Sequence, residues 1–473
     1  MRSLLLGNGI NIQFGGKAYS NYFIMERIRF KAKMDRYVEL FNNTLDGSTI
    51  VAILDEFPLI ANDIRNGEYD KYVIEEDTKE ALEGFKQRYP ENIKASYEIM
   101  LEDWFFLLHM FFLKNADLTN NKNLATQGFE HLILDGIYNE GKIQNLYLKI
   151  PKQAKKFFDD FDNIFTLNYD DNMEKLTGKN VYHLHGEFNT LANSENPNSV
   201  QGYLRTLSGE IVTVKGMENS FCNALLNYSG MLKYKTAQAF HNLITTTDDW
   251  IDRYDTDSAL RKSINDLKDI NPLLYQMFMT KKEHPELNMA PEYYFDRFSN
   301  ISDELCIIGM SPNNDDHIFK LITNNKRITK VIFCYFSEKE KEYVEINYPK
   351  DLFDCKNVND LWRSLDCITP RYHCKYSLPS DIDKYIKIFN ALSGSVVTKK
   401  QIMDEIEQIP RFEMERLYKI LETDRDLQRL DNKPKTEHEF NVKKARISYI
   451  ALQEGIYPST LYLIYTMCKA NRM

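Results

Sequence analysis

The chain has 473 residues, of which 43% are hydrophobic and 13% aromatic, and its formal net charge is -9 at pH 7. This composition excludes a disordered chain, and the chain is long enough for more than one domain. The acidic balance argues against a general polyphosphate-binding surface and against docking on an anionic membrane.

Neither the N-terminus nor the cysteines indicate export or membrane insertion. The apolar run Leu4–Leu6 stops at Gly7 and is too short for the core of a signal peptide. The longest apolar run, Trp104–Leu113, is shorter than the roughly 20 residues that a spanning helix needs. The seven cysteines are scattered without a Cys-x-x-Cys pair, which is typical of free thiols in a reducing compartment. We therefore expect a cytoplasmic protein that has no four-cysteine zinc site and no contact with a membrane.

Five short apolar runs predict β-strands, and helical stretches separate several of them. Polar or glycine-containing sequence follows each run. Continuous apolar strands of this kind are typical of a parallel sheet that helices cover on both faces. The sequence therefore predicts an open, Rossmann-like α/β fold with ligands at the carboxyl ends of its strands. The runs are Ser3–Leu6, Asn163–Leu167, Val181–Leu184, Leu305–Ile308 and Val331–Tyr335.

Two long, mainly helical insertions interrupt this pattern, at about residues 25–150 and 190–300. The clearest helix of the first insertion is Ala95–Asn115. The second insertion opens with an Asn/Ser/Pro-rich loop, Asn189–Asn198, which follows the candidate site residue His185 and could cover it. Because Trp104–Leu113 is apolar on nearly all faces of a helix, either the core or a second copy must enclose it. We expect a homo-oligomer, with burial inside one chain as the alternative.

The pattern changes near Ser377–Ser380, so we expect an α/β domain over residues 1–375 and a helical C-terminal domain over residues 376–473. Thr398 can cap a helix over Lys399–Gln408, and a second helix starts near Arg411 after a proline. This spacing resembles a helix-turn-helix. However, residues 396–430 carry seven basic and eight acidic side chains, whereas DNA-reading helices are normally more basic. We therefore favour a structural, protein-contact or trigger-sensing role over direct nucleic-acid binding.

The first candidate binding motif follows the first predicted strand and reads Gly7-Asn8-Gly9-Ile10-Asn11. Glycines at a strand end let the backbone turn sharply and approach a phosphate or ribose closely. The alternative is a tight turn without a ligand. A fourth strand runs similarly into Gly309 and Ser311, followed by the polar segment Asn313–His317.

Two further motifs end the second and third strands. Asn168 offers an amide donor and acceptor, and Asp170 adds a carboxylate two residues later; an Asx-turn that ends the strand is the alternative. In His183-Leu184-His185-Gly186, strand alternation places both histidines on one face, with His185 nearer the ligand crevice. A metal ion shared by the two histidines is a lesser alternative, because no third ligand is suggested by spacing.

The order of these motifs is similar to that of the sirtuin superfamily. The chain carries Gly-x-Gly-x-Asn at 7–11, Thr-x-Asn-x-Asp at 166–170, His-Gly at 185–186 and Gly-x-Ser at 309–311. It resembles most closely the bacterial sirtuin-like phage-defence NADases and the related abortive-infection proteins that open with a Gly-Asn-Gly loop. The resemblance covers residues 1 to about 370 in motif order.

This resemblance implies an enzyme that cleaves NAD to nicotinamide and ADP-ribose, as a triggered NAD-depleting effector of antiphage defence that works with a partner ATPase or another phage-sensing protein. Asn168 and His185 would be the catalytic asparagine and histidine, with His185 as a general base. Asp170 would contact the nicotinamide side. The cofactor phosphates and ribose would lie on Gly7, Asn8, Gly9 and Asn11, and the adenosine part on Gly309 and Ser311.

Two departures separate the chain from the deacylase sirtuins. Those enzymes carry a zinc module with paired cysteines, and they usually have alanine where Asn8 stands here. NAD hydrolysis without zinc is therefore the expected activity. The alternatives are a non-catalytic subunit that senses NAD or ADP-ribose, or a scaffold or effector subunit of a nucleic-acid-associated defence complex.

Overall fold

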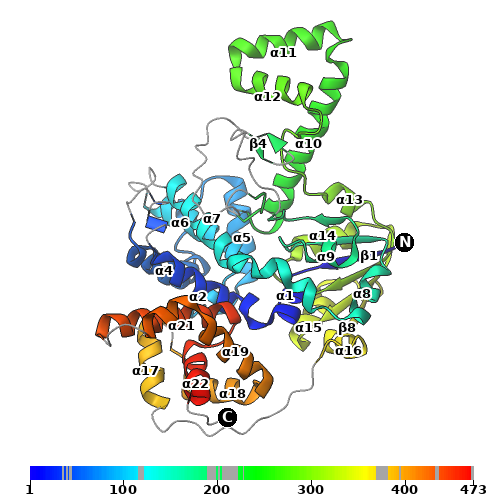
Figure 1. Cartoon of the computed structure of the whole chain (residues 1–473). Helices are drawn as coiled ribbons and strands as arrows, with labels where there is room; N and C mark the ends of the chain where they lie inside the picture. The colour runs from blue at the N-terminus through cyan, green and yellow to red at the C-terminus, as the bar shows by residue number, and fades with distance from the viewer. Residues whose placement is uncertain are drawn as a thin grey trace.

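The computed structural model describes residues 1–34, 37–38, 41, 45–115, 122–188, 199–200, 203–204, 222–226, 228–368, 382–393, 396–431 and 436–469. At its centre lies a six-stranded sheet in the order β3-β2-β1-β6-β7-β8, with every neighbouring pair parallel (Figure 1). Counted along the chain, this is the 3-2-1-4-5-6 order of the Rossmann fold. The Rossmann-like α/β prediction is therefore confirmed at this level.

The structure confirms all five predicted strands and adds a sixth that the sequence did not predict. The additional edge strand has the sequence Phe-Asp-Cys-Lys-Asn, which is not an apolar run because only one of its edges pairs with the sheet. A separate two-stranded antiparallel hairpin consists of β4 (Ser199–Val200) and β5 (Tyr203–Leu204). The strands of the large sheet are β1 (Arg2–Leu6), β2 (Asn163–Thr166), β3 (Val181–His183), β6 (Asp303–Ile308), β7 (Ile328–Tyr335) and β8 (Phe353–Asn357).

Helices cover both faces of the sheet because successive strand residues point to opposite sides. In β1, Leu4 and Leu6 belong to the core under one set of helices, and Leu5 belongs to the core under the other. The first set is α1 (Gly9–Gly15), α8 (Lys152–Asp159), α9 (Asn172–Thr177) and α16 (Val358–Ser364). The second set is α13 (Phe295–Ser299), α14 (Asp316–Asn324) and α15 (Glu338–Asn347), together with the start of α10 (Gly230–Tyr254).

The first insertion forms a helical unit beside the sheet with a core of its own. Its α6 is the helix predicted over Ala95–Asn115, shortened at its N-terminal end. The members of this unit are α2 (Asn21–Ala32), α4 (Gly47–Arg65), α5 (Glu76–Arg88), α6 (Leu101–Lys114) and α7 (Lys122–Tyr138).

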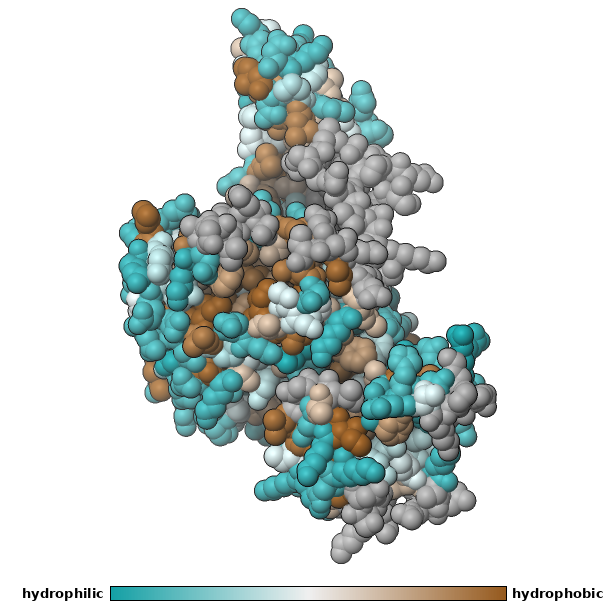
Figure 2. All heavy atoms as spheres, turned by 90° about the vertical axis from the view of Figure 1, so that its left-hand side faces the viewer, coloured by the Kyte–Doolittle hydropathy of each residue, from teal (hydrophilic) through white to brown (hydrophobic). Residues whose placement is uncertain are grey.

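The apolar face of α6 is satisfied within one chain. Leu107, Leu108 and Met110 are at most 2% exposed, and even the half-buried Phe106 and Phe111 pack against the same core. The outer face on the side of α4 and α6 carries apolar side chains interrupted by polar ones (Figure 2). The core of one chain therefore encloses α6, and no second copy is needed to cover it. Self-association stays a prediction, but the apolar face of α6 does not support it. None of the helices that the structure describes is long and apolar enough to cross a membrane.

The second insertion contributes an arm of three helices that projects from the body (Figure 1). The long α10 begins beside the sheet and leads outward to α11 (Ser258–Ile270) and α12 (Pro272–Glu283). The proposed covering loop, Asn189–Asn198, lies outside the described residues.

The C-terminal helices pack around a hydrophobic core of their own. The predicted helices at Lys399 and Arg411 are confirmed, and Thr398 forms a capping box with Gln401. The predicted boundary near Ser377–Ser380 lies outside the described residues. The helices are α17 (Ile382–Ser393), α18 (Lys399–Gln408), α19 (Arg411–Thr423), α20 (Arg425–Asp431), α21 (Glu437–Glu454) and α22 (Pro458–Lys469).

A buried arginine fastens these helices to the first insertion. Arg27 on α2 is 0% exposed and donates to the carbonyl oxygens of Gly136 at 2.9 Å, Ala18 at 2.6 Å and Leu452 at 3.0 Å. Burial lowers the pKa of Arg27 to about 10. Gly455 ends α21 in the left-handed conformation, where an added Cβ would lie 2.2 Å from the nitrogen of Ala18. The two segments therefore meet backbone to backbone.

We predict that Arg27→Met loosens the C-terminal helices. The substitution leaves three buried carbonyl groups without a donor, each costing about 1–3 kcal/mol, so a destabilisation of about 3 kcal/mol or more is expected. Hydrogen exchange of the α21 amides and the denaturation midpoint measure it. Arg253→Met is the matched control, because Arg253 is 51% exposed in its ion pairs and such pairs contribute about 0–1 kcal/mol. Unchanged exchange in α21 would contradict this anchoring role.

Candidate active site

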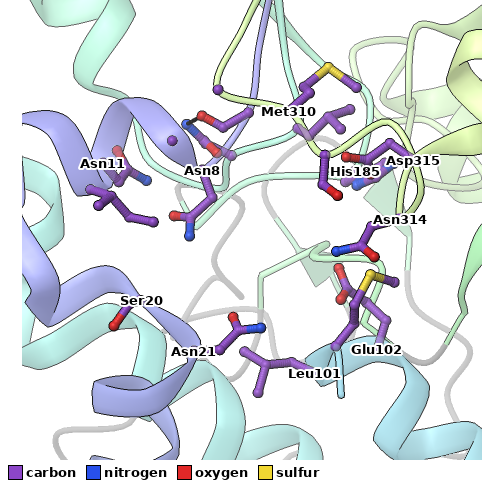
Figure 3. Close-up of a pocket in the computed structure, with 18 of the residues that line it drawn as sticks. Asn8, Asn11, Ser20, Asn21, Leu101, Glu102, His185, Met310, Asn314 and Asp315 are labelled. Atoms are coloured by element: carbon purple, nitrogen blue, oxygen red, sulfur yellow. Dashed lines mark hydrogen bonds between the residues drawn. The ribbon is translucent and has the colours of Figure 1, made fainter. Parts of the chain in front are cut away.

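A cavity lies at the carboxyl ends of the strands, where the strand order reverses between β1 and β6. Its volume is about 580 Å³. Asn8 and Asn11 lie on one side of it and His185, Asn314 and Asp315 on the other (Figure 3). Of the nine predicted site residues, eight line this cavity: Gly7, Asn8, Gly9, Asn11, Asn168, His185, Gly309 and Ser311.

The glycines of the two loops are required by the contact between them. Gly9 donates its backbone N–H to the carbonyl oxygen of Gly309 at 2.9 Å, and an added Cβ on Gly9 would lie 2.5 Å from Cα of Gly309. Gly309 has φ +76°, which also favours glycine. Gly7 would place a Cβ 2.5 Å from the same carbonyl oxygen. Packing alone therefore explains these glycines, and phosphate binding by the loop stays a prediction.

Asn168 is held at the cavity wall by its own backbone and by the first loop. Its Nδ2 donates to the carbonyl oxygen of Gly7 at 3.2 Å, and its backbone N–H donates to Oγ1 of Thr166 at 3.0 Å. Within the part of the chain that the structure describes, no donor reaches its Oδ1. That oxygen is therefore available to accept a hydrogen bond from a ligand.

Asp170 does not line the cavity and supports Asn11 from behind. It is 5% exposed and accepts from Nδ2 of Asn11 at 2.8 Å and from the backbone of Asn172 at 3.2 Å. Burial raises the pKa of Asp170 despite these hydrogen bonds. Its carboxylate bonds to the chain itself, which supports a positioning role, and the nicotinamide contact stays a prediction.

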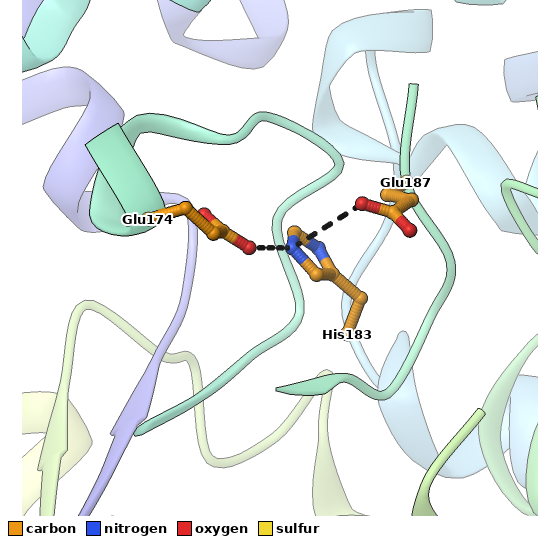
Figure 4. A group of neighbouring side chains, drawn as sticks. All are labelled: Glu174, His183 and Glu187. Carbon is orange, nitrogen blue, oxygen red and sulfur yellow. Dashed lines mark hydrogen bonds and ion pairs between the residues drawn. The ribbon is translucent and has the colours of Figure 1, made fainter. Parts of the chain in front are cut away.

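His183 is part of a buried ion pair behind Asn168 (Figure 4). Its Nδ1 lies 2.8 Å from the carbonyl oxygen of Asn168, and its Nε2 lies 2.6 Å from Glu174 and 3.8 Å from Glu187. Burial opposes the charged form, yet the hydrogen bond to Glu174 and the charges of both glutamates raise the pKa of His183 to about 9. The ring is therefore an imidazolium at neutral pH that donates from both nitrogens.

This ion pair bears on metal binding. The ligand-type atoms of Glu174, His183 and Glu187 lie within 4.8 Å of one another, and a metal ion bound there would have to displace a proton of His183. A second such group, His241, Glu292 and Asp296, does not line the cavity. His183 and His185 have different partners, which does not support the shared-ion alternative. The absence of zinc stays a prediction.

His185 closes the other end of the cavity together with residues from both insertions. It is 4% exposed, and its Nδ1 lies 3.2 Å from Nζ of Lys233 on α10, which in turn lies 3.0 Å from Glu102 on α6. The ring of His317 stacks on that of His185, with centroids 5.8 Å apart. Burial and the charge of Lys233 lower the pKa of His185 well below its usual value, so the ring is neutral.

Asp315 completes this end of the cavity. Burial and the charge of Glu102 raise its pKa to about 7. The sequence noted the segment Asn313–His317 but assigned no role to Asp315 within it. Glu102 and Lys233 carried no signal at all, because each is an ordinary charged residue on a helix far along the chain from the motifs. Ser311 and Gly309 lie at the cavity wall, where adenosine binding stays a prediction.

Comparisons of the chain with protein-family models, with curated proteins and with solved structures find no match. The functional argument therefore depends on the geometry of the site and on the motif resemblance.

We predict that stability falls with rising pH because of His183. A histidine whose pKa is raised from 6.5 to about 9 stabilises the fold fully below pH 6.5, and this contribution is lost as the pH rises through 9. The shift corresponds to about 3 kcal/mol. In Glu174→Gln, the difference in free energy of unfolding between pH 6.5 and pH 9 should shrink. Denaturation at both pH values measures it.

The matched control for this experiment is Glu286→Gln, because Glu286 pairs with the exposed His284 at 3.3 Å. It should leave the pH dependence as in the wild type. Equal pH dependence in Glu174→Gln and the wild type would contradict an ionised His183.

Proposed function

We propose that the chain is a sirtuin-like NAD glycohydrolase that cleaves the nicotinamide–ribose bond and releases nicotinamide and ADP-ribose. One observation carries the proposal. Asn168, which is 161 residues from the first glycine loop in sequence, is hydrogen-bonded to that loop in one cavity that also contains His185. The cavity lies where sheets of this strand order bind dinucleotides. Its volume of about 580 Å³ is within the usual range of small-molecule sites.

The chemistry requires positioning more than strong acid catalysis. As the bond to C1′ breaks, the ribose gains oxocarbenium character, and nicotinamide leaves as a neutral molecule from a cation. The enzyme must hold the ribose in place, stabilise the developing positive charge and supply an activated water. The carboxyl groups of Glu102 and Asp315 provide negative potential at the His185 end of the cavity.

Asn168 fits the positioning role. Because Gly7 accepts from its Nδ2, the amide is oriented with Oδ1 available to the ligand. This oxygen suits a ribose hydroxyl or the attacking water, either of which donates a hydrogen bond. The backbone of Asn168 is in turn fixed by the imidazolium of His183.

The biological setting of the proposal depends on the resemblance alone. A triggered NAD-depleting effector of antiphage defence would stay inactive until a partner ATPase or another phage-sensing protein acts on it. The C-terminal helices are our candidate for the trigger-sensing part.

A non-catalytic NAD- or ADP-ribose-sensing subunit is the second candidate. One observation favours it: burial lowers the pKa of His185 well below its usual value, which makes the ring a weak general base. The same cavity contacts would then bind the nucleotide without turnover.

We predict that Asn168→Ala and His185→Ala each lower nicotinamide release from NAD by about 100-fold or more, which is the scale of losing a positioning or proton-handling group. Chromatography of purified full-length protein with NAD, in the presence and absence of nucleic acid, measures the release. Asn347→Ala and His284→Gln are matched controls on the exposed surface.

Folded variants that release nicotinamide at the wild-type rate would overturn the assignment of these two residues. Wild-type protein that binds NAD without cleaving it under all these conditions would favour the sensing subunit.

A further inference from the structure

At the end of the cavity that contains His185, the hydrogen bond between Lys233 and His185 can run in only one direction. Lys233 is 1% exposed. Its Nζ lies 3.0 Å from a carboxylate oxygen of Glu102 and 3.2 Å from Nδ1 of His185. An ammonium group has three donors and no acceptor. Nδ1 of His185 must therefore accept, and the proton of the neutral ring is on Nε2.

Nε2 of His185 has no hydrogen-bond partner within the part of the chain that the structure describes, although it is buried. The same is true of both ring nitrogens of His317, which is 4% exposed and stacks on His185. Buried polar groups without a partner are rare and costly. Since both rings line the cavity, a ligand with hydroxyl groups is the natural partner for these nitrogens.

Asp315 occupies an N-cap position without acting as a cap. It precedes α14, where an aspartate usually accepts from the first backbone N–H groups of the helix, but its side chain makes no such bond. Among the described residues, the backbone N–H of Ser311 donates to its carboxyl group, and no ion pair to that group occurs. The side chain lines the cavity on the same side as His185 instead (Figure 3).

We infer that this end of the cavity separates the proton-handling roles: Lys233 fixes His185 as a hydrogen-bond donor at Nε2, and the carboxylate of Asp315 accepts the proton of the attacking water. This inference deepens the proposed function and depends on it for the identity of the substrate. His185 and Asp315 are then catalytic residues that contact the substrate or the water, and Lys233 is a positioning residue.

The step balances without a further reactant. The carboxylate of Asp315 takes one proton from water, and the oxygen forms the new bond to C1′ of the ribose. The electron pair of the breaking C1′–N bond leaves with nicotinamide and neutralises its ring charge. Nε2–H of His185 donates to a ribose hydroxyl oxygen throughout, and the proton on Asp315 passes to solvent after the products leave.

Charges around Asp315 suit this role. Its pKa of about 7 places the carboxyl group near half-ionisation at neutral pH, where a general base is most effective. Burial and Glu102 raise this pKa, and Lys233 opposes them. The titratable groups that face it from the surrounding elements are Glu102, Lys233, Tyr169, His185, His317 and Tyr348.

The first arm of the test needs no turnover. Nitrogen-15 NMR of histidine-labelled full-length protein, with His185 assigned by comparison with His185→Gln, reports which ring nitrogen carries the proton. We expect a protonated Nε2 and an unprotonated Nδ1 at pH 7.5. Lys233→Met should abolish this fixed pattern, and Lys233→Arg should restore it. Lys235→Met, an exposed lysine on the same helix, should leave it unchanged. An unprotonated Nε2 in the wild type would overturn the inference.

The second arm follows Asp315. The ring nitrogens of His185 and His317 should sense a titration with a midpoint near pH 7 in the wild type, and Asp315→Asn should remove it. A carboxyl pKa raised from 3.8 to about 7 costs stability as the pH rises between these values, and the full cost is present at pH 8, so Asp315→Asn should not lower the thermal midpoint there. A titration that persists in Asp315→Asn would exclude Asp315 as its source and overturn the role.

The third arm uses nicotinamide release. Asp315→Asn should lower kcat by about 100-fold, change KM by less than about threefold and remove the rise in rate near pH 7. His185→Gln keeps an amide donor, so it should retain at least about 10-fold more activity than His185→Ala. Equal losses in these two variants, or wild-type rates in Asp315→Asn, would refute the division of roles. A wild type without turnover would refute the proposed function, whereas the two NMR arms would still decide the tautomer and the titration.

Discussion

The backbone contact between the loops after β1 and β6 sets the geometry of the whole site. Gly9 donates to the carbonyl oxygen of Gly309 at 2.9 Å, at the point where the strand order reverses and the chain continues from β1 and from β6 toward opposite edges of the sheet. A Cβ on Gly9 would lie 2.5 Å from Cα of Gly309, so the two loops can pack this closely only because both residues are glycines. Asn168 then bonds to Gly7 of the first loop. The contact thus holds three strand ends within reach of one ligand.

Loops at the strand ends contribute to both ends of the cavity, and the helical insertions add Glu102 and Lys233 at the His185 end. Glu102 comes from α6 of the first insertion and Lys233 from α10 of the second, and they meet at 3.0 Å beside His185. A buried ammonium that loses its carboxylate partner is strongly unfavourable, so the two insertions stabilise each other where Lys233 and Glu102 meet. The insertions are therefore part of the site and also explain why a Rossmann-like sheet here carries so many additional residues.

The sequence predicted the elements whose signal is local and missed those whose signal depends on distant neighbours. Apolar runs revealed five strands, but β8 pairs on one edge only and its polar sequence resembles a loop. Asn168 and His185 were found because each follows such a run. Lys233 could not be found, since its partners Glu102 and His185 are 131 and 48 residues away.

Charge states were the least predictable property of the site. His183 and His185 are two residues apart, yet the first pairs with Glu174 and the second with Lys233. One is therefore an imidazolium and the other a neutral ring, a difference that strand alternation does not reveal. The role of Asp170 was similarly hidden: the motif does not reveal that its buried carboxylate accepts a hydrogen bond from Asn11.

The C-terminal helices contact a short turn beside this site, the four-residue 3-10 helix η1 (Gly16–Tyr19). Nδ2 of Asn8 donates to the carbonyl oxygen of Tyr19 at 2.9 Å, and Arg27 bridges Ala18 of the same turn to Leu452 of α21. A ligand shifts a protein between arrangements only by binding one of them better. A partner that binds α17–α22 and displaces α21 would break the Arg27 bridge and release one side of the turn on which Asn8 depends. Control of the cavity from the C-terminal helices therefore requires no contact between the partner and the cavity itself.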